Sequence, residues 1–350
     1  MNLDNIKITP LMDTLRLEDI SDDIYFSEKF SEYISNSRLK LIDPTEGGTP
    51  AKFFSGLSAN KIYSDSLVFG SALHELVLQN EEFVVVDSVN RPTAKAGAIA
   101  DITYKHSYLG DMPSDHYLLN AAAEVDYYSG ILTENQLVKL KEKLSDYMLS
   151  RYIYEKDRSD TRIPIYLDGK SREKLESCMQ SLNSNPFINS LLNPVGLIND
   201  PVTGYEKTIL LDVQVETPDL DPFVLRLKSK LDDFTLDFDS NEVIVNDLKT
   251  TGKRADAFES AVMSFRYYRE LAMYGYLLML CAKKFYGFKS PTLKGNFLVV
   301  STIPNYNTRV VPMTKKLFIR GFEEFKHLLK LVAYYKAYGY DDVPGLKVLS

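Results

Sequence analysis

The stretch LRLKSKLDDFTLDFDSNEVIVNDLKTT, residues 225–251, decides the fold of this 350-residue chain. Two runs rich in Leu, Val, Ile and Phe flank the polar sequence DSNE, which is typical of two strands joined by a turn. The same character begins near residue 205. We therefore expect three consecutive strands, at Tyr205–Glu216, Pro222–Phe234 and Glu242–Thr250.

The residues after these strands alternate between helical and strand patterns. The spacing of apolar residues predicts a long helix over Ala255–Phe285, broken near Ser264. Two further strands, Gly295–Ser301 and Thr308–Met313, precede a final helix from about Lys315 to Tyr338. The expected core is a mixed sheet with helices against it.

The residues before the three strands are mostly helical in pattern. Apolar residues recur at helical spacing in 29–42 and 65–80, and Phe83–Val86 has the pattern of a short strand. From about 95 to 195 the pattern stays mostly helical, and it is clearest in Asn135–Tyr154. The predicted fold class is α/β (α+β), a mixed central sheet flanked by helices with a largely helical N-terminal elaboration.

The sequence contains neither an internal repeat nor a linker-like tract, so we expect one domain over 1–350. Its mainly helical part would be 1–200, and 201–350 would hold the sheet. No apolar run is long enough to span a bilayer, and the N-terminus MNLDNIKITP lacks the pattern of a secretion signal. We therefore expect a cytoplasmic protein with no membrane partner.

The chain has few residues that bind soft metals. Its only two cysteines, Cys178 and Cys281, exclude a four-cysteine zinc or iron–sulfur site within one chain. The histidines are too scattered for a zinc motif: His74, His106, His116 and His327. A metal would be held by oxygen ligands, which favours magnesium, manganese or calcium. The formal net charge of −7 does not favour tight non-specific binding of nucleic acid, but it is compatible with a locally basic groove.

The two strands of residues 225–251 place charged residues together. With a turn at Asp239–Glu242 and antiparallel pairing, Asp232 faces Lys249 and Phe234 faces Asp247. Because strand side chains alternate between faces, both aspartates and the lysine share one face. Two carboxylates can hold a divalent cation, which lowers the pKa of a bound water and neutralises charge on phosphate oxygens. A nearby lysine can orient that water or stabilise developing charge.

The same alternation puts three basic residues, Arg226, Lys228 and Lys230, on the Asp232 face. A basic stripe beside two carboxylates and a lysine suits phosphate chemistry. An amphipathic hairpin with a solvated polar face and an ordinary Asp–Lys pair would have the same pattern, because surface ion pairs are common. The hairpin alone leaves both interpretations open.

The hairpin also resembles a known family. The run VNDLKTT, preceded by KSKLDDF, resembles the active-site core of PD-(D/E)XK nucleases, particularly the RecB-like branch. Asp232 matches the first acid of the family pattern, Asp247 the second and Lys249 the lysine, whereas Ser229 replaces the usual glycine. The resemblance implies a restriction-endonuclease-like core.

Two flanking segments resemble helices of the same branch. FGSALHELVL looks like its Gly-x-x-x-His helix, with His74 at the matching place. YYRELAMYGYLL resembles its Gln-x-x-x-Tyr helix, in which Tyr274 matches but Glu270 stands where glutamine is usual. Segments nearer the ends, YISNSRLKLIDP with TPAKFFSGL and then FLVVSTIPNYNTRVVPMTKKLFIRGFEEFKHLL, resemble the exonuclease VIII (RecE) type of phage nuclease. The likeness covers residues from about 30 to 340, with the motifs in the family's order.

The resemblance implies a role for each matched residue. Asp232 and Asp247 would ligate Mg²⁺, or Mn²⁺, with the carbonyl of Leu248 as a further ligand, and Lys249 would be the catalytic lysine. His74 would reach the same metal from its helix, with a core histidine as the alternative. The iron–sulfur members of the branch are excluded by the missing cysteines.

Other site residues have an alternative of comparable weight. Glu206 sits where related enzymes often place an extra acid, and a solvated strand-end glutamate fits as well. Glu270 and Tyr274 would position DNA or the lysine, and helix packing is an equal alternative for Tyr274. Basic residues would neutralise DNA phosphates: Arg226, Lys228, Lys230, Lys253, Arg254, Arg266 and Arg269. Tyr267 and Tyr268 could stack on unpaired bases, unless this is a solvated helix face with buried tyrosines.

Together the motifs predict a magnesium-dependent DNA nuclease. By resemblance it would be an exonuclease that degrades linear double-stranded DNA from its ends, in phage-type recombination or replication inside a bacterial or phage-infected cell. The family's processive members form rings around DNA and work beside a single-strand annealing protein, so a homo-oligomer and such a partner are expectations. The alternatives are a RecB-like endonuclease or single-strand nuclease, a non-catalytic DNA-binding protein that keeps the fold, and an unrelated metal-binding protein.

Overall fold

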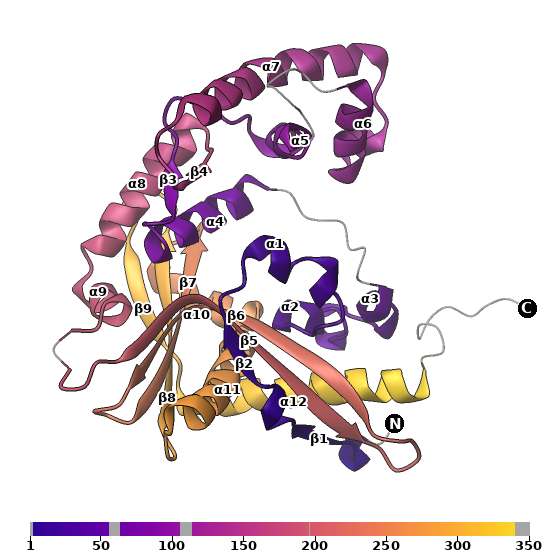
Figure 1. Cartoon of the computed structure of the whole chain (residues 1–350), viewed down its shortest axis with the longest axis vertical. Coiled ribbons are helices and arrows are strands. Elements are labelled where there is room, and N and C mark those ends of the chain that lie inside the picture. The colour runs from indigo at the N-terminus through magenta and orange to yellow at the C-terminus, as the bar shows by residue number, and fades with distance from the viewer. Residues whose placement is uncertain (1–2, 56–63, 106–113, 196, 340–350) are drawn as a thin grey trace, which may run out of the picture. The chain divides into compact units, whose positions relative to one another are not determined.

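A computed structural model describes most of the chain, in the stretches 3–55, 64–105, 114–195 and 197–339 (Figure 1). His106 and the last two residues of the TPAKFFSGL segment lie outside the described residues. The chain separates into two compact units, which we call the sheet unit (Met1–Ala59 with Asn183–Ser350) and the helical unit (Asn60–Leu182). Residues 1–59, predicted to belong to the helical part, are therefore in the sheet unit.

The sheet unit is built on a seven-stranded sheet in the order β1–β5–β6–β7–β8–β9, with β2 also paired to β5. Neighbouring strands are antiparallel except β7 and β8, which run parallel. The predicted mixed central sheet is confirmed. The strands are β1 Lys7–Pro10, β2 Arg16–Glu18, β5 Val202–Glu216, β6 Phe223–Asp237, β7 Glu242–Thr251, β8 Thr292–Ser301 and β9 Thr308–Pro312.

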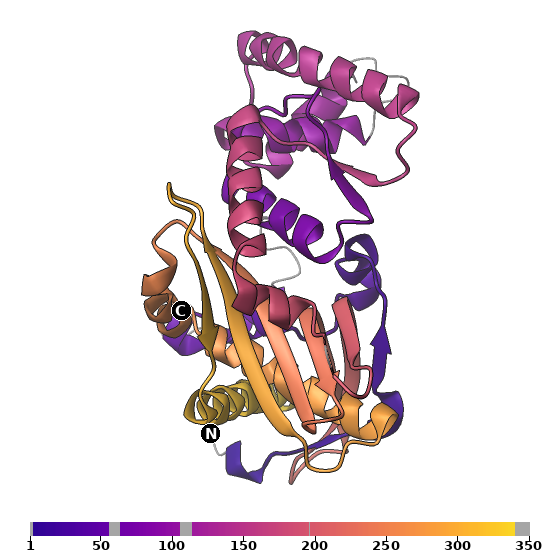
Figure 2. The same cartoon turned by 90° about the vertical axis from the view of Figure 1, so that its left-hand side faces the viewer.

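Helices that follow β7 pack against this sheet (Figure 2). The crossover from β7 to β8 runs through η7 (Ala255–Ala257), α10 (Phe258–Ser264) and α11 (Tyr267–Tyr286), so the predicted break near Ser264 is confirmed. The last helix, α12 (Lys315–Tyr338), has the predicted bounds. Apolar side chains of the strands, α11 and α12 share one core.

The N-terminal segment differs from the prediction of a helix over 29–42. Only η3 (Glu28–Phe30) and α2 (Asn36–Leu39) form, and between them Ile34 pairs with the edge of β6. The Ile34 N–H donates to the Arg226 carbonyl at 2.7 Å, and the Ile34 carbonyl accepts from Lys228 N at 3.0 Å. A continuous helix would need these same backbone groups, so that prediction is wrong. The other short elements of this unit are η1 Leu3–Asn5, η2 Met12–Thr14, α1 Asp22–Tyr25, η4 Pro44–Glu46, α3 Pro50–Ser55 and α9 Pro186–Leu192.

The helical unit agrees with the predicted pattern. Its longest helix begins with a capping box, in which the side chains of Thr133 and Gln136 each bond the other's backbone N–H. A two-stranded parallel sheet, β3 with β4, accompanies the helices. The elements are α4 Asp65–Leu78, β3 Phe83–Val85, α5 Ala94–Tyr104, α6 Asp115–Glu124, η6 Tyr127–Gly130, α7 Glu134–Asp157, β4 Ile163–Ile165 and α8 Gly169–Asn183. Among the described residues, none of the helices combines the length and apolar character that a bilayer span needs.

Candidate active site

The turn between β6 and β7 has the predicted length but lies one residue earlier in the chain. The register runs from Asp237 opposite Glu242 to Asp233 opposite Asn246, so the predicted pairing of Asp232 with Lys249 is wrong by two residues. The Asp237 carboxylate stabilises the turn in this position, because it accepts hydrogen bonds from two backbone N–H groups and a hydroxyl of the turn. A shift of two residues leaves every side chain on its predicted face of β7.

The two strands part at Asp232. Their ladder ends at the pair Asp233 and Asn246, and the next register position would bring Asp232 and Asp247 together. Instead of a strand carbonyl, Oδ2 of Asp232 accepts the backbone N–H of Leu248, at 2.8 Å. Two carboxylates from neighbouring strands therefore meet where β6 leaves β7.

Lys249 lies among three carboxylates. Its Nζ is 2.9 Å from Oδ1 and 2.8 Å from Oδ2 of Asp247, and 3.3 Å from Oε1 of Glu270 on α11. The ammonium also lies 5.3 Å from the ring centre of Tyr267, within cation–π range. The structure thus brings the predicted lysine, second acid and Glu270 into direct contact.

Burial dominates the electrostatics of the two aspartates. It raises the pKa of Asp232 to about 6 and of Asp247 to about 7, although the charge of Lys249 lowers both. Burial disfavours the Lys249 ammonium, but the carboxylates of Asp247, Glu270 and Asp232 prevail and raise its pKa well above the usual value. Burial raises the pKa of the Glu270 carboxyl, but the nearby positive charge of Lys249 outweighs burial, so the pKa is lowered. Lys40 and Lys230 also act electrostatically on Glu270 and Asp232, so Lys249 is not the only cation that offsets these carboxylates.

The donor set fits an oxygen-preferring cation. Asp247 is 2% exposed, and its Oδ2 has no hydrogen bond from any described residue, although it forms the ion pair with Lys249. A buried carboxylate oxygen without a hydrogen bond, beside a second buried carboxylate, suits a hard divalent cation. The buried Cys178 thiol belongs to the helical unit, and the buried Cys281 thiol lies farther along α11 than Glu270.

Glu206 occupies a strained position on β5. Its backbone φ is +51°, a left-handed value that costs free energy in a residue with a Cβ. The β5–β6 pairing passes from Tyr205 and Asp233 to Lys207 and Leu231, which leaves Glu206 opposite Asp232. The Glu206 carboxylate lies 2.9 Å from Nζ of Lys230. Strain of this kind is common at functional sites, and it supports Glu206 as a fifth member of the cluster.

The remaining predicted site residues lie on α4 and α11. Tyr274 follows Glu270 by one helical turn, and burial, then the Glu270 charge, raise its pKa well above the usual value. His74 lies on α4 of the helical unit and is partly buried. Its part in a metal site stays a prediction.

Two residues of the predicted basic stripe, Arg226 and Lys228, do not lie on the face of the site. The β6 side chains that face the main core lie at odd-numbered positions up to Leu231 and at even-numbered positions from Phe234 onward. The alternation between the two faces of β6 therefore breaks beside Asp232. The prediction assumed an unbroken alternation and is wrong for this reason. Arg226 pairs with Glu32 and Lys228 donates to the Tyr25 carbonyl. Lys230 pairs with both Asp22 and Glu206, so it reaches the edge of the site.

The predicted DNA-contacting residues of the later segment divide by exposure. Arg269 is fully buried and pairs with Asp43 and Glu46, so the prediction that it contacts DNA is wrong. The partly buried Arg266 pairs with Glu324 at 2.9 Å. The exposed residues of the set are Lys253 and Arg254, together with Arg226.

Two buried polar groups were missed by sequence reasoning. Asn36, 2% exposed, donates from Nδ2 to Oε2 of Glu270 at 2.9 Å. On the other face of the sheet, Asn296 donates to Asn246 at 2.8 Å and Asn246 donates to Asp233 at 2.6 Å. Asn36 falls in the YISNSRLKLIDP segment, whose family resemblance could have pointed to it. The chain of Asn296, Asn246 and Asp233 depends on strand pairing that the sequence patterns did not predict.

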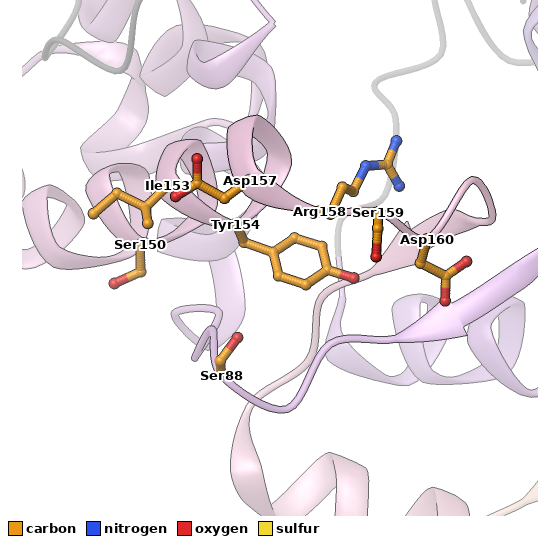
Figure 3. Close-up of a pocket in the computed structure, with 8 residues that line it drawn as sticks. All are labelled: Ser88, Ser150, Ile153, Tyr154, Asp157, Arg158, Ser159 and Asp160. Atoms are coloured by element: carbon orange, nitrogen blue, oxygen red, sulfur yellow. The ribbon is translucent and has the colours of Figure 1, made fainter.

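A hollow of about 550 Å³ in the helical unit contains none of the predicted site residues (Figure 3). Two of its charged groups are already engaged, because Arg158 donates to the Arg162 carbonyl at 2.6 Å and Asp160 pairs with the Arg162 guanidinium at 2.7 Å. It is lined by Ser88, Ser150, Ile153, Tyr154, Asp157, Arg158, Ser159 and Asp160. We assign no function to it.

Comparisons with known proteins leave the function to be argued from this site. No family model matches the sequence, and no curated protein matches it. Among solved structures the chain is similar to a crystal structure of a "Putative exonuclease" from Eubacterium rectale, with 12% sequence identity and a TM-score of 0.44 over 93% of this chain and 89% of that chain. A similarity at this level carries no argument about fold or function.

Proposed function

We propose that the protein is a divalent-metal-dependent DNA nuclease whose active site lies where β6 and β7 part. The observation that carries the proposal is the contact of Lys249 with Asp247 and Glu270, beside the buried carboxylate of Asp232. Lys249 contacts two of these acids, and Lys40 and Lys230 also act electrostatically on Glu270 and Asp232, yet burial still raises the pKa of both aspartates. Buried carboxyls with pKa values shifted in this way cluster at functional sites.

Asp232 and Asp247 would hold the cation. Both carboxyls have pKa values raised by burial, so loading with metal would release protons and would strengthen as pH rises. The N–H of Leu248 points toward Asp232, and the N–H and C=O of one strand residue lie along the same edge. The Leu248 carbonyl is therefore proposed as a third ligand, and Glu206 and His74 as further ones.

A bound Mg²⁺ or Mn²⁺ would supply a water of lowered pKa and would neutralise charge on the phosphate oxygens. Lys249 remains protonated at neutral pH, because its pKa is raised by the surrounding carboxylates. Its ammonium can donate hydrogen bonds to the attacking water or to a phosphate oxygen. Glu270 restrains that ammonium from the side of α11.

The substrate is proposed to be DNA. Lys253 and Arg254 follow β7 directly after the site and are exposed, so they can contact phosphates of a bound strand. Action on free ends of linear double-stranded DNA, a homo-oligomer and an annealing partner are proposed on the sequence resemblance alone.

The experiment compares end-labelled linear DNA with covalently closed circular DNA, each with magnesium and with chelator. We expect linear DNA to be degraded only with the metal, and closed circles to survive. Equal cutting of closed circles would make the protein an endonuclease. No cutting of any substrate, with DNA binding unchanged by Asp247→Ala, would support a binding protein and contradict the nuclease proposal.

A further inference from the structure

Two hydrogen-bond donors converge on the Glu270 carboxylate from opposite sides. Nζ of Lys249 lies 3.3 Å from Oε1, and Nδ2 of Asn36 lies 2.9 Å from Oε2. A lysine ammonium has only donors, so Oε1 has to accept. Whether Oε2 also has to accept depends on which way the Asn36 amide points.

Arg269 fixes the orientation of that amide. Its Nε donates to Oδ1 of Asn36 at 3.2 Å, and a guanidinium has no acceptor that would suit the flipped amide. Arg269 is itself immobilised, because it is fully buried and its two terminal nitrogens pair with Asp43 and Glu46. The Asn36 amide nitrogen therefore has to face Glu270.

We propose that Asn36, oriented by Arg269, is a positioning residue that holds Glu270 against Lys249 and requires an acceptor on both sides of residue 270. A carboxylate meets this requirement with two oxygens, whereas a glutamine has one oxygen and would turn its NH₂ toward a donor. The pairing accounts for glutamate at a position where the resembled family has glutamine. Its consequence for catalysis rests on the proposed nuclease function.

Swapping the amide of residue 36 with the carboxylate of residue 270 should preserve the hydrogen bonds. In Glu270→Gln, the amide oxygen can still face Lys249, but its NH₂ then meets the NH₂ of Asn36. In Asn36→Asp, a carboxylate accepts from Arg269 but repels Glu270. In the double variant, the new carboxylate at position 36 accepts from both Arg269 and the new amide NH₂ at position 270. The amide oxygen at position 270 then accepts from Lys249, so every donor again has an acceptor.

The test measures single-turnover cleavage of linear DNA at saturating DNA and magnesium for wild type, both single variants and the double variant. Each single variant should cleave about tenfold to a hundredfold more slowly, which matches one unsatisfied buried donor or one repulsive contact. The double variant should recover to within about threefold of wild type, since all three donors are paired again. The DNA dissociation constant should stay unchanged, because Asn36 acts through Lys249 and not through DNA.

A second readout does not depend on catalysis. The denaturant midpoint of unfolding should fall in each single variant and recover in the double variant. As a matched control, Glu155→Gln removes a paired carboxylate from the helical unit, where it accepts from Arg151 at 2.8 Å and from Tyr166 at 2.9 Å. It should lower the midpoint without changing cleavage.

Each outcome is decisive. Wild-type cleavage by Glu270→Gln, or a double variant no better than the slower single variant, would overturn the inference. If wild type does not cleave DNA, the nuclease proposal fails. The recovery of the unfolding midpoint would still test the donor–acceptor chain in that case.

Discussion

Two clusters of charged side chains, one in each unit, differ in how fully their carboxylates are satisfied. In the helical unit, Arg151 bridges Asp101 at 3.2 Å and Glu155 at 2.8 Å, and Arg91 donates to the second oxygen of Asp101 at 2.8 Å. Tyrosine hydroxyls supply the remaining donors: Tyr147 to Asp101, and Tyr104 and Tyr166 to Glu155. Both arginines contact Asp101, Arg91 also reaches the half-exposed Asp65 at 3.7 Å, and each oxygen of Asp101 and Glu155 accepts a hydrogen bond.

The cluster of the sheet unit is less fully hydrogen-bonded. Lys249 contacts Asp247 and Glu270, while Lys40 and Lys230 also act electrostatically on the acids. Oδ2 of Asp247 lies 2.8 Å from the Lys249 ammonium but accepts no well-directed hydrogen bond from the described residues. A network in which every carboxylate oxygen accepts a hydrogen bond stabilises the fold. A buried carboxylate oxygen that lacks a hydrogen bond is costly unless a cation binds it. The difference separates the candidate site from a structural cluster without reference to any relative.

The largest expected effect is the loss of cleavage on removing Lys249. Lys249→Met deletes the ammonium that contacts Asp247 and Glu270, and we expect single-turnover cleavage to fall by about 10²–10³-fold or more. The matched control is Lys283→Met, at an exposed lysine in the last turn of α11, which should cleave at the wild-type rate. Similar rates for both variants would remove Lys249 from the reaction.

Removing a cation from the cluster of the helical unit should affect stability instead. Arg151→Met leaves Asp101 and Glu155 without their shared partner, and we expect the free energy of unfolding to fall by about 2–3 kcal/mol, less than for a fully buried pair. Denaturant unfolding measures this change, and cleavage per folded molecule should be unchanged. Arg162→Met, which breaks an exposed pair with Asp160, should leave the midpoint nearly unchanged. Equal effects of the two variants would contradict the structural role of Arg151.

The cluster of the sheet unit should make the metal-free protein less stable as pH rises. Folding raises the pKa of Asp232 to about 6 and of Asp247 to about 7, above the roughly 3.9 of an unfolded aspartate. The folded state therefore binds more protons between these values, and stability falls from about pH 4 to about pH 7. Asp247→Asn should flatten this decline, as measured by unfolding midpoints in chelator.

Magnesium should offset the decline. At a concentration tenfold above its dissociation constant it should stabilise wild type by about 1.4 kcal/mol at pH 7.5, and Asp247→Asn far less. A pH profile that is identical in wild type and Asp247→Asn, with and without magnesium, would show that the cluster does not bind the ion.

The smallest effect is expected on the predicted basic stripe. Arg226 lies on the surface, paired with Glu32 at 3.3 Å, and not on the face of the site. Arg226→Ala should change cleavage by less than about threefold, because an exposed pair contributes little. A loss of cleavage as large as that of Lys249→Met would show that Arg226 belongs to the site.

The sequence predicted the parts of this structure that depend on local pattern. The period-2 alternation of β7 put Asp247 and Lys249 on one face, and it held although the strand register differs from the predicted one by two residues. The bounds of α12 were also predicted, and in the structure the Thr314 side chain caps its start and Gly339 follows its end.

The sequence predictions were wrong where contacts between distant segments of the chain determine the position of a side chain. The burial of Arg269 depends on Asp43 and Glu46, more than 200 residues earlier in the chain. The face of the basic stripe differs from the prediction because the alternation of buried side chains in β6 breaks between Leu231 and Phe234. Neither feature has a signature in local spacing or composition.

The central claim is that the cluster of Asp232, Asp247 and Lys249 binds a divalent cation and cleaves DNA. The most direct measurement is the single-turnover cleavage rate of linear double-stranded DNA by wild type and Asp247→Asn as magnesium is titrated. We predict that cleavage by wild type rises to saturation with magnesium, and that Asp247→Asn, at equal fold stability, stays near the chelator baseline. Cleavage by wild type in chelator, or a wild-type magnesium curve from Asp247→Asn, would contradict the account.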